Sequence, residues 1–132
     1  MKNSYSESGP ELGSLSSWQL INEIFNTVLT ESASLSNLVL VDPGTSEERI
    51  RLESLVLSLN DKLSSIIRYL GTLLDSSAGG KTIGELYGWY LDNLDIVCSS
   101  GSSIHSKKVA GANLVEQSKG FLDIWQGMKD AA

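Results

Sequence analysis

The chain has 132 residues, 41% of them hydrophobic and 20% charged, which fits one globular domain built around a single core. Its 10 basic residues stand against 16 acidic ones, and the resulting net charge of −6 repels phosphate backbones and anionic lipid headgroups. This balance argues against a protein that binds nucleic acid or a membrane surface.

The single cysteine and the N-terminal residues bear on the cellular compartment. Cys98 has no second cysteine with which to form an internal disulfide, and residues 1–9 lack the apolar core of a secretion signal. Polar residues interrupt every apolar run before it reaches the roughly 18 residues that a membrane-spanning helix needs. We therefore expect a soluble, cytoplasmic protein.

The first part of the chain divides into an arm and a helix. Residues 1–15 are rich in Ser, Gly and Glu, so they offer little apolar surface to offset the entropy of ordering, and a flexible arm is expected. From Ser16 or Ser17, either of which can serve as N-cap, a helix is predicted that ends before Asp42, Pro43 and Gly44. Its apolar face comprises Ile21, Ile24, Phe25, Val28, Leu29, Leu35, Leu38 and Val39.

The second predicted helix carries the most regular apolar pattern. Thr45 and Glu48 have the spacing of a capping box, and the helix is expected to run to Asp75, just before the Gly79–Gly80 pair. Its apolar residues alternate steps of four and three, as in the seam of an antiparallel bundle or coiled coil. They are Leu52, Val56, Leu59, Leu63, Ile66, Leu70 and Leu73.

A third helix is predicted to begin at a second capping box and to end in a Ser-rich segment. Thr82 and Glu85 form the box, and residues 99–103 end the helix. The apolar residues on its face are Ile83, Leu86, Tyr87, Tyr90, Leu91, Leu94 and Val97.

A fourth helix completes the pattern, although two glycines interrupt it. Gly111 and Gly120 each cost about 1 kcal/mol relative to Ala inside a helix, so a break or fraying is expected there. The apolar positions taken to mark this helix are Val109, Ala112, Val115, Leu122, Trp125 and Met128. No segment alternates with period two between hairpin turns, so the expected fold is all-α, an antiparallel four-helix bundle over residues 16–132.

One short motif suggests nucleotide binding. Gly79, Gly80, Lys81 and Thr82 resemble the end of a phosphate-binding P-loop. That loop also needs a glycine at position 75, which is Asp here, and a preceding strand, where a helix is expected. The sequence favours a plain turn between helices.

Catalytic and metal-binding residues are sparse. His105 is the only histidine, so with Cys98 it cannot make a zinc site of several such ligands, and no Glu-x-x-His motif occurs. A Cys–His pair or a pair of carboxylates remains a formal possibility, but no third group that would orient the imidazole is evident. We expect no enzyme, no cofactor and no metal site.

Several apolar residues fall outside the predicted seams. On the second helix these include Leu55, Leu57, Ile67 and Leu74, so this helix is apolar on more than one side. Trp18 and Trp89 also lie beside their stripes. Two interpretations stay open: a wide core with scattered surface apolar residues, or a groove that receives an amphipathic helix from a partner.

The order of these segments resembles the FliS-type flagellin export chaperones, which are small acidic helical bundles. The similarity rests on a Tyr in a polar N-terminal arm, the pattern of residues 20–29, the run 66–75 ending in Leu-Asp, and residues 123–125. Leu86, Tyr87 and Trp89 are similar to the family's Leu-Tyr-x-Tyr motif. The chain departs from the family where Asp92 and Asn93 replace a usual Arg pair.

The resemblance implies a cytoplasmic chaperone that binds the disordered C-terminal segment of flagellin, prevents premature polymerisation, and delivers it to the flagellar export apparatus. The expected partners are flagellin and components of the export gate, and a monomer or weak homodimer is expected. Helices two and three would form most of the binding groove. The predicted contacts are Tyr5, Leu55, Leu57, Ile67, Leu74, Tyr87 and Trp89. The alternative is a regulatory or scaffold bundle that binds another cytoplasmic protein.

Overall fold

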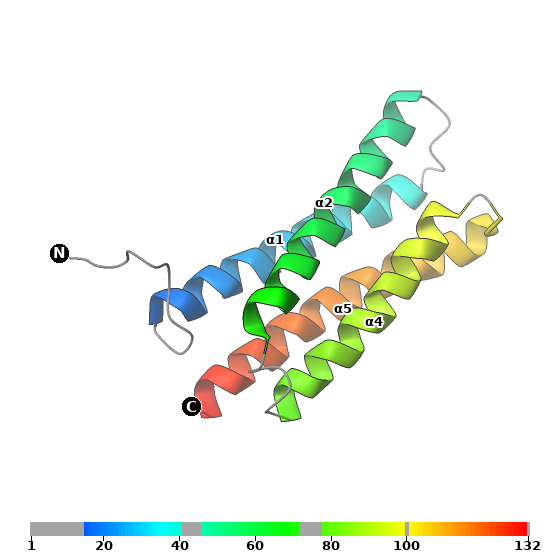
Figure 1. Cartoon of the computed structure of the whole chain (residues 1–132). Helices are drawn as coiled ribbons and strands as arrows, with labels where there is room; N and C mark the ends of the chain where they lie inside the picture. The colour runs from blue at the N-terminus through cyan, green and yellow to red at the C-terminus, as the bar shows by residue number, and fades with distance from the viewer. Residues whose placement is uncertain (1–14, 41–45, 72–77, 100, 132) are drawn as a thin grey trace.

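Four helices make up the computed structural model, which describes residues 15–40, 46–71, 78–99 and 101–131. They are α1 (Leu15–Leu40), α2 (Ser46–Leu70), α4 (Ala78–Cys98) and α5 (Ile104–Ala131). Successive helices run in opposite directions (Figure 1), and the described residues contain no strand. The predicted antiparallel four-helix bundle is therefore confirmed. Residues 1–14 of the predicted arm lie outside the described residues, whereas Leu15 already belongs to α1, so the predictions that the arm includes Leu15 and that Ser16 or Ser17 is the N-cap were wrong.

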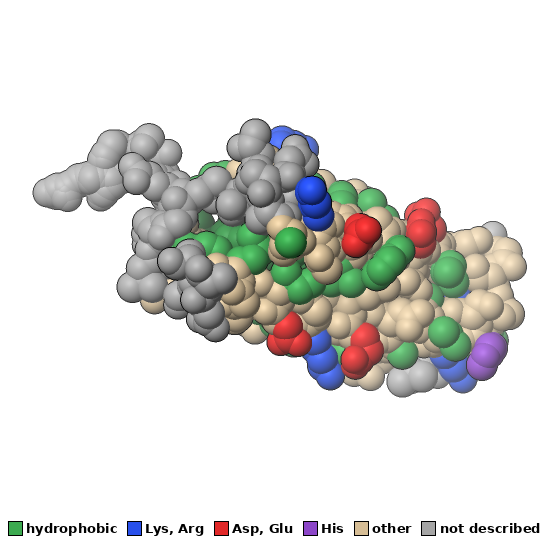
Figure 2. Space-filling model, turned by 90° about the horizontal axis from the view of Figure 1, so that it is seen from below, with side chains coloured by type: hydrophobic (Ala, Val, Ile, Leu, Met, Phe, Trp, Pro, Cys, Tyr) green, Lys and Arg blue, Asp and Glu red, His purple; other side chains and the backbone are tan. Residues whose placement is uncertain are grey.

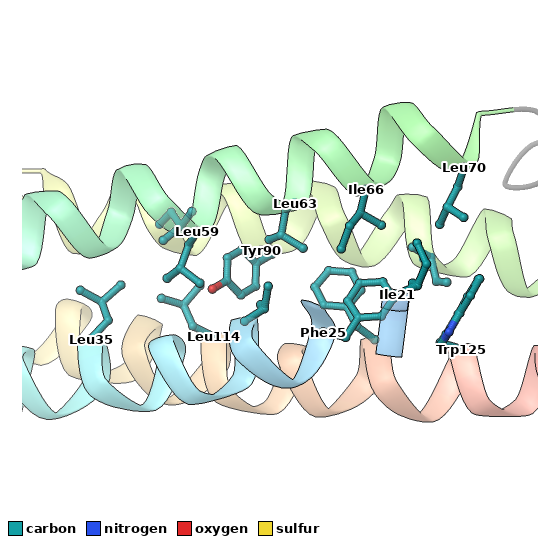
Figure 3. Close-up of a cluster of buried hydrophobic side chains, with 14 of the residues drawn as sticks. Ile21, Phe25, Leu35, Leu59, Leu63, Ile66, Leu70, Tyr90, Leu114 and Trp125 are labelled. Carbon is teal, nitrogen blue, oxygen red and sulfur yellow. The ribbon is translucent and has the colours of Figure 1, made fainter. Parts of the chain in front are cut away.

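Helix α5 packs against α1 on one side and α4 on the other. Helix α2 packs mainly against α1 and less against α4, and in Figure 1 its N-terminal half diverges from α4. Figure 3 shows Leu59, Leu63, Ile66 and Leu70 of α2 pointing into the interior, where Tyr90 lies. All the fully buried residues of α2 thus belong to its C-terminal half.

Trp18 belongs to the core, contrary to the expectation that it lies outside the stripe of the first helix. Its side chain is buried, and its ring lies 3.8 Å from that of Trp125, centroid to centroid. The Trp125 indole Nε1 also donates a hydrogen bond of 3.2 Å to the Trp18 carbonyl oxygen. This aromatic pair joins the start of α1 to the end of α5.

Helix α2 ends at Leu70, five residues before the predicted end at Asp75. Gly71 has a φ of +42°, in the left-handed region that glycine adopts without steric cost, and its N–H donates to the Ile67 carbonyl oxygen at 3.1 Å. Gly71, which lies between Leu70 and Leu73 of the predicted apolar seam, is thus the residue that ends the helix. Leu73 lies outside the described residues.

Helix α4 begins before the predicted capping box. Gly79 and Gly80 are already helical, and the Thr82 hydroxyl donates to the Ala78 carbonyl oxygen at 2.9 Å within the helix, so Thr82 is not the N-cap. A Cβ at position 79 would lie 2.7 Å from Cγ of Met128. This glycine therefore lets the first turn of α4 approach the last turns of α5, and the interpretation of the glycine pair as an interhelical turn was wrong.

Helix α5 is continuous, so the predicted break at its glycines was also wrong. A Cβ at Gly111 would lie 3.2 Å from Cα of Ser36 on α1, and a Cβ at Gly120 would lie 2.9 Å from Leu86 on α4. Each glycine lets α5 approach a different neighbour. The cost in helix propensity is met by close packing between helices.

The buried face of α5 differs from the predicted one. Val109 is 47% exposed and Ala112 is exposed, whereas a neighbouring stripe faces the core. That stripe consists of Ala110, Leu114, Phe121 and Trp125. Phe121 stacks on Phe25 of α1 with ring centroids 5.3 Å apart. Only Trp125 of the six predicted positions is fully buried.

Three hydroxyl groups meet in the middle of the core. Ser118 donates to the Leu114 carbonyl oxygen at 2.7 Å, so its oxygen accepts from Ser32 at 2.9 Å, and Ser32 in turn accepts from Tyr90 at 2.5 Å. The chain of donors joins α1, α4 and α5. Burial of the ring raises the pKa of Tyr90 to about 12, which keeps this phenol in its donating form.

Candidate binding groove

A groove of about 500 Å³ runs between α1 and α2. It is open to solvent on one side, and its accessible lining is mostly apolar. The helix α1 contributes Leu20, Ile21, Ile24 and Thr27, and the helix α2 contributes Asp61, Lys62, Ser65, Ile66 and Tyr69. This size and this lining are typical of sites that bind ligands through apolar contact.

The apolar arc of α1 is wide enough to serve both the core and the groove. Ile21 is buried in the core but still borders the groove, while Ile24 is half-buried and Leu20 is 43% exposed. On α2, Ile66 is buried and Tyr69 is 44% exposed. The groove therefore has a floor of buried core residues and a rim of exposed apolar side chains.

The two ends of the groove differ in polarity because α1 and α2 are antiparallel. Leu20, near the start of α1, shares one end with Tyr69, near the end of α2. Thr27 shares the other end with Asp61 and Lys62. A ligand in the groove would meet apolar surface at the first end and charge at the second.

Lys62, at the polar end, is held by two neighbours. Its ammonium lies 3.3 Å from a Glu31 carboxylate oxygen on α1 and donates to the Ser58 hydroxyl at 2.5 Å. Ser58 itself donates to Glu31 at 3.0 Å. The partly buried ion pair joins α1 to α2 beside the groove and neutralises the lysine.

The seven predicted contacts occupy three kinds of position. Leu55, Ile67 and Tyr87 are half-buried and pack against the core. Leu57 is 64% exposed and Trp89 is 57% exposed, so both present apolar surface to solvent. Tyr5 and Leu74 lie outside the described residues. None of the five that the structure describes is among the residues lining the groove between α1 and α2, and the role of all seven in partner binding stays a prediction.

The side of the molecule formed by α4 and α5 has a different character. Figure 2 views the molecule from this side and shows a broken band of hydrophobic side chains with acidic and basic side chains along both edges. Asn93 of α4 donates to the Gln117 side chain at 3.5 Å, and Asn113 donates to Asn93 at 3.3 Å. The seam between these helices is thus partly closed by side-chain amides.

The sequence interpretation missed the groove because α1 was assigned a single apolar face. Ile21 and Ile24 were predicted as core, and Leu20 entered only as part of the family resemblance. The adjacent pair Leu20 and Ile21, followed by Ile24, already widens the apolar arc beyond one stripe. The width of this apolar arc could have indicated a second apolar surface on α1, but such a surface was predicted only for the second helix.

Of the groups considered for catalysis, the Cys98 thiol has a shifted pKa. Desolvation of the thiol, with the carboxylates of Asp95 and Glu53 adding to it, raises the pKa of Cys98, which is the opposite of what a nucleophilic thiolate needs. No group of three or more His, Cys, Asp or Glu residues in the described part of the chain has the geometry to hold a metal ion. None of the described helices is both long and apolar enough to cross a membrane.

Comparison of the chain with protein-family models, with curated proteins and with solved structures finds no match. Function is therefore inferred from the groove and from the sequence resemblance alone.

Proposed function

We propose that this protein is a cytoplasmic export chaperone of the FliS type, which binds the C-terminal segment of flagellin as an amphipathic helix. It would keep the segment from polymerising and deliver it to the flagellar export apparatus. The observation that carries the proposal is the open apolar groove between α1 and α2.

The shape of the groove suits a helical client. Two antiparallel helices form its walls, and core residues such as Ile21 and Ile66 form its floor, so the site exists before the client arrives. An amphipathic helix laid between them would bury its apolar face against Leu20, Ile24 and Tyr69. A disordered segment that folds on contact would thus exchange water-exposed apolar side chains for this surface.

The rest of the molecule supports a binding role over a catalytic one. The described lining of the groove brings together apolar side chains, hydroxyl groups, the Asp61 carboxylate and the ion-paired Lys62, and most of its accessible surface is apolar. The net charge of −6 also opposes self-association of the free chaperone by mutual repulsion, in line with a monomer or at most a weak homodimer.

Titration calorimetry of the full chain with the C-terminal segment of the flagellin from the same organism tests the proposal. We expect saturable binding with a large negative heat-capacity change, because the segment folds as it buries apolar surface. Absence of binding to this segment would contradict the proposal. Binding to a folded cytoplasmic protein instead would favour the regulatory or scaffold bundle.

A further inference from the structure

We infer that the groove selects a helix that carries a basic side chain beside its apolar face, and that Asp61 is the residue that recognises this charge. The inference rests on the proposed function in one respect, namely that the occupant is an amphipathic helix. It adds the chemistry that such a helix must present.

Asp61 lies in the middle of an exposed row along α2. Leu57, Asp61, Ser65 and Tyr69 follow each other at intervals of four residues, so each lies about one turn from the next and the row winds gradually around the helix. At a rise of about 1.5 Å per residue, each step covers about 6 Å and the whole row about 18 Å. Tyr69, Ser65 and Asp61 line the groove in that order, and Leu57 lies one turn further along α2, outside the lining.

The charges at this end of the groove do not cancel. Lys62 is neutralised by Glu31 at 3.3 Å, and this pair also holds Ser58. The exposed carboxylate of Asp61 makes no ion pair or hydrogen bond with any residue in the described part of the chain. Among the described residues that line it, the polar end of the groove thus carries one negative charge in excess.

This excess charge determines what a bound helix can bring next to it. A helix in the groove would cover part of the Asp61 carboxylate and remove water from it, which is costly unless an opposite charge replaces the water. A lysine or arginine at that point would form an ion pair, whereas a glutamate or aspartate would be repelled. The expected occupant has apolar residues against Ile24 and Tyr69, and a basic residue one to two turns further along.

The row also gives Leu57 a place in this surface. Leu57 lies one turn beyond Asp61 along α2, past the residues that line the groove, and is 64% exposed. A helix long enough to pass Asp61 would bring an apolar side chain against it. The pattern to expect in the client is therefore apolar, basic and again apolar on one side of the helix.

Three synthetic peptides of about 18 residues, long enough to cover the row, provide the probe. Each is an amphipathic helix with a leucine face, and the three differ only at one central position beside that face, which holds Lys, Gln or Glu. Binding to the full chain is measured by titration calorimetry at low and at high salt. The expected order of affinity is Lys, Gln, Glu, with roughly a threefold step between neighbours at low salt, as for exposed ion pairs, and smaller steps at high salt.

Three variants of the protein locate the effect. Asp61→Asn should bring the three affinities together. Asp92→Asn removes an exposed carboxylate from α4, which does not line the groove, and should preserve the order. Leu20→Gln changes an exposed rim residue and should weaken all three peptides alike.

Equal affinity of the three peptides for the unmodified protein, or the same order in Asp61→Asn, would overturn the assignment to Asp61. Peptide affinities that Leu20→Gln leaves unchanged would place the peptides elsewhere and overturn it too, as would no binding of any peptide. The proposed function fails separately, if the flagellin segment does not bind although the peptides do.

Discussion

At the scale of single residues, the hydroxyl chain through Tyr90, Ser32 and Ser118 fixes how three helices meet. Each hydroxyl has one proton, and since Ser118 gives its proton to the Leu114 carbonyl, the direction of the other two bonds follows. A buried polar chain of this kind is satisfied in only one arrangement of α1, α4 and α5. We attribute to it the specification of the register between these helices.

Removing the phenol hydroxyl should weaken the fold without disrupting it. In Tyr90→Phe, Ser32 still donates to Ser118, so no buried donor is orphaned, and we expect a loss of about 1 kcal/mol in the free energy of unfolding. Urea denaturation at neutral pH measures this loss. A loss several times larger would mean that the ring itself had moved from its place in the core.

The raised pKa of Tyr90, about 12, predicts how stability changes in alkali. The unfolded phenol ionises near pH 10, so the folded state holds this proton more tightly than the unfolded state does. The contribution of the protonated Tyr90 to the free energy of unfolding should therefore be complete below about pH 10, and it should be lost as the pH rises from about 10 to about 12. The free energy of unfolding, measured by urea denaturation across this pH range, should fall by this contribution in the unmodified protein but not in Tyr90→Phe. The same dependence on pH in both proteins would contradict the burial of the Tyr90 hydroxyl.

At the scale of elements, the number and type of the helices could be predicted from the sequence, but their limits depend on tertiary contacts. The apolar period identified all four helices. It could not show that Gly71 adopts a positive φ while Gly79, Gly111 and Gly120 stay helical, because those three are retained by neighbours that a Cβ would crowd. The prediction of the buried face of α5 was wrong because that face is also decided by contacts with other helices, such as the stacking of Phe121 on Phe25 of α1.

Two glycine-to-alanine changes should act in opposite directions. Gly88 lies on the exposed side of α4 with no atom within 4 Å of the place that a Cβ would take, so Gly88→Ala should raise the free energy of unfolding by about 1 kcal/mol through helix propensity. In Gly111→Ala the new methyl group would lie 3.1 Å from the Ser36 Oγ and 3.2 Å from its Cα, and we expect a net loss. Urea denaturation of both variants tests this. A gain in Gly111→Ala equal to that in Gly88→Ala would show that α1 and α5 are not closely packed there.

At the scale of the whole molecule, α1, α4 and α5 form the more tightly packed part, and α2 covers it over half of its length. The groove arises from this arrangement, because the C-terminal half of α2 sits on the core beside the exposed rim of α1. A sequence shows which residues are apolar on a helix but not which two helices leave a gap between them. The groove between α1 and α2 could therefore not be predicted from the sequence, and the predicted contacts on the second and third helices stay a prediction.

Because α2 is packed unevenly along its length, its N-terminal half should unfold locally more often than its C-terminal half. Residues 46–56 contain no fully buried side chain, whereas the following part of α2 contributes four. Amide hydrogens of residues 50–56 should therefore exchange faster than those of residues 59–70 and of the middle of α5 under native conditions. Hydrogen exchange followed by mass spectrometry measures this; uniform protection along α2 would contradict it.

The client helix is proposed to lie between α1 and α2, and the most direct test of this position compares two exposed apolar residues. Titration calorimetry with the flagellin C-terminal segment is carried out on Leu20→Gln, in the groove, and on Trp89→Gln, on α4 outside it. Leu20→Gln removes one apolar contact, which should cost about 1.5 kcal/mol of binding free energy and weaken binding about tenfold. Trp89→Gln should bind the segment as tightly as the unmodified protein does. Weakened binding in Trp89→Gln with unchanged binding in Leu20→Gln would contradict the account and move the site to α4.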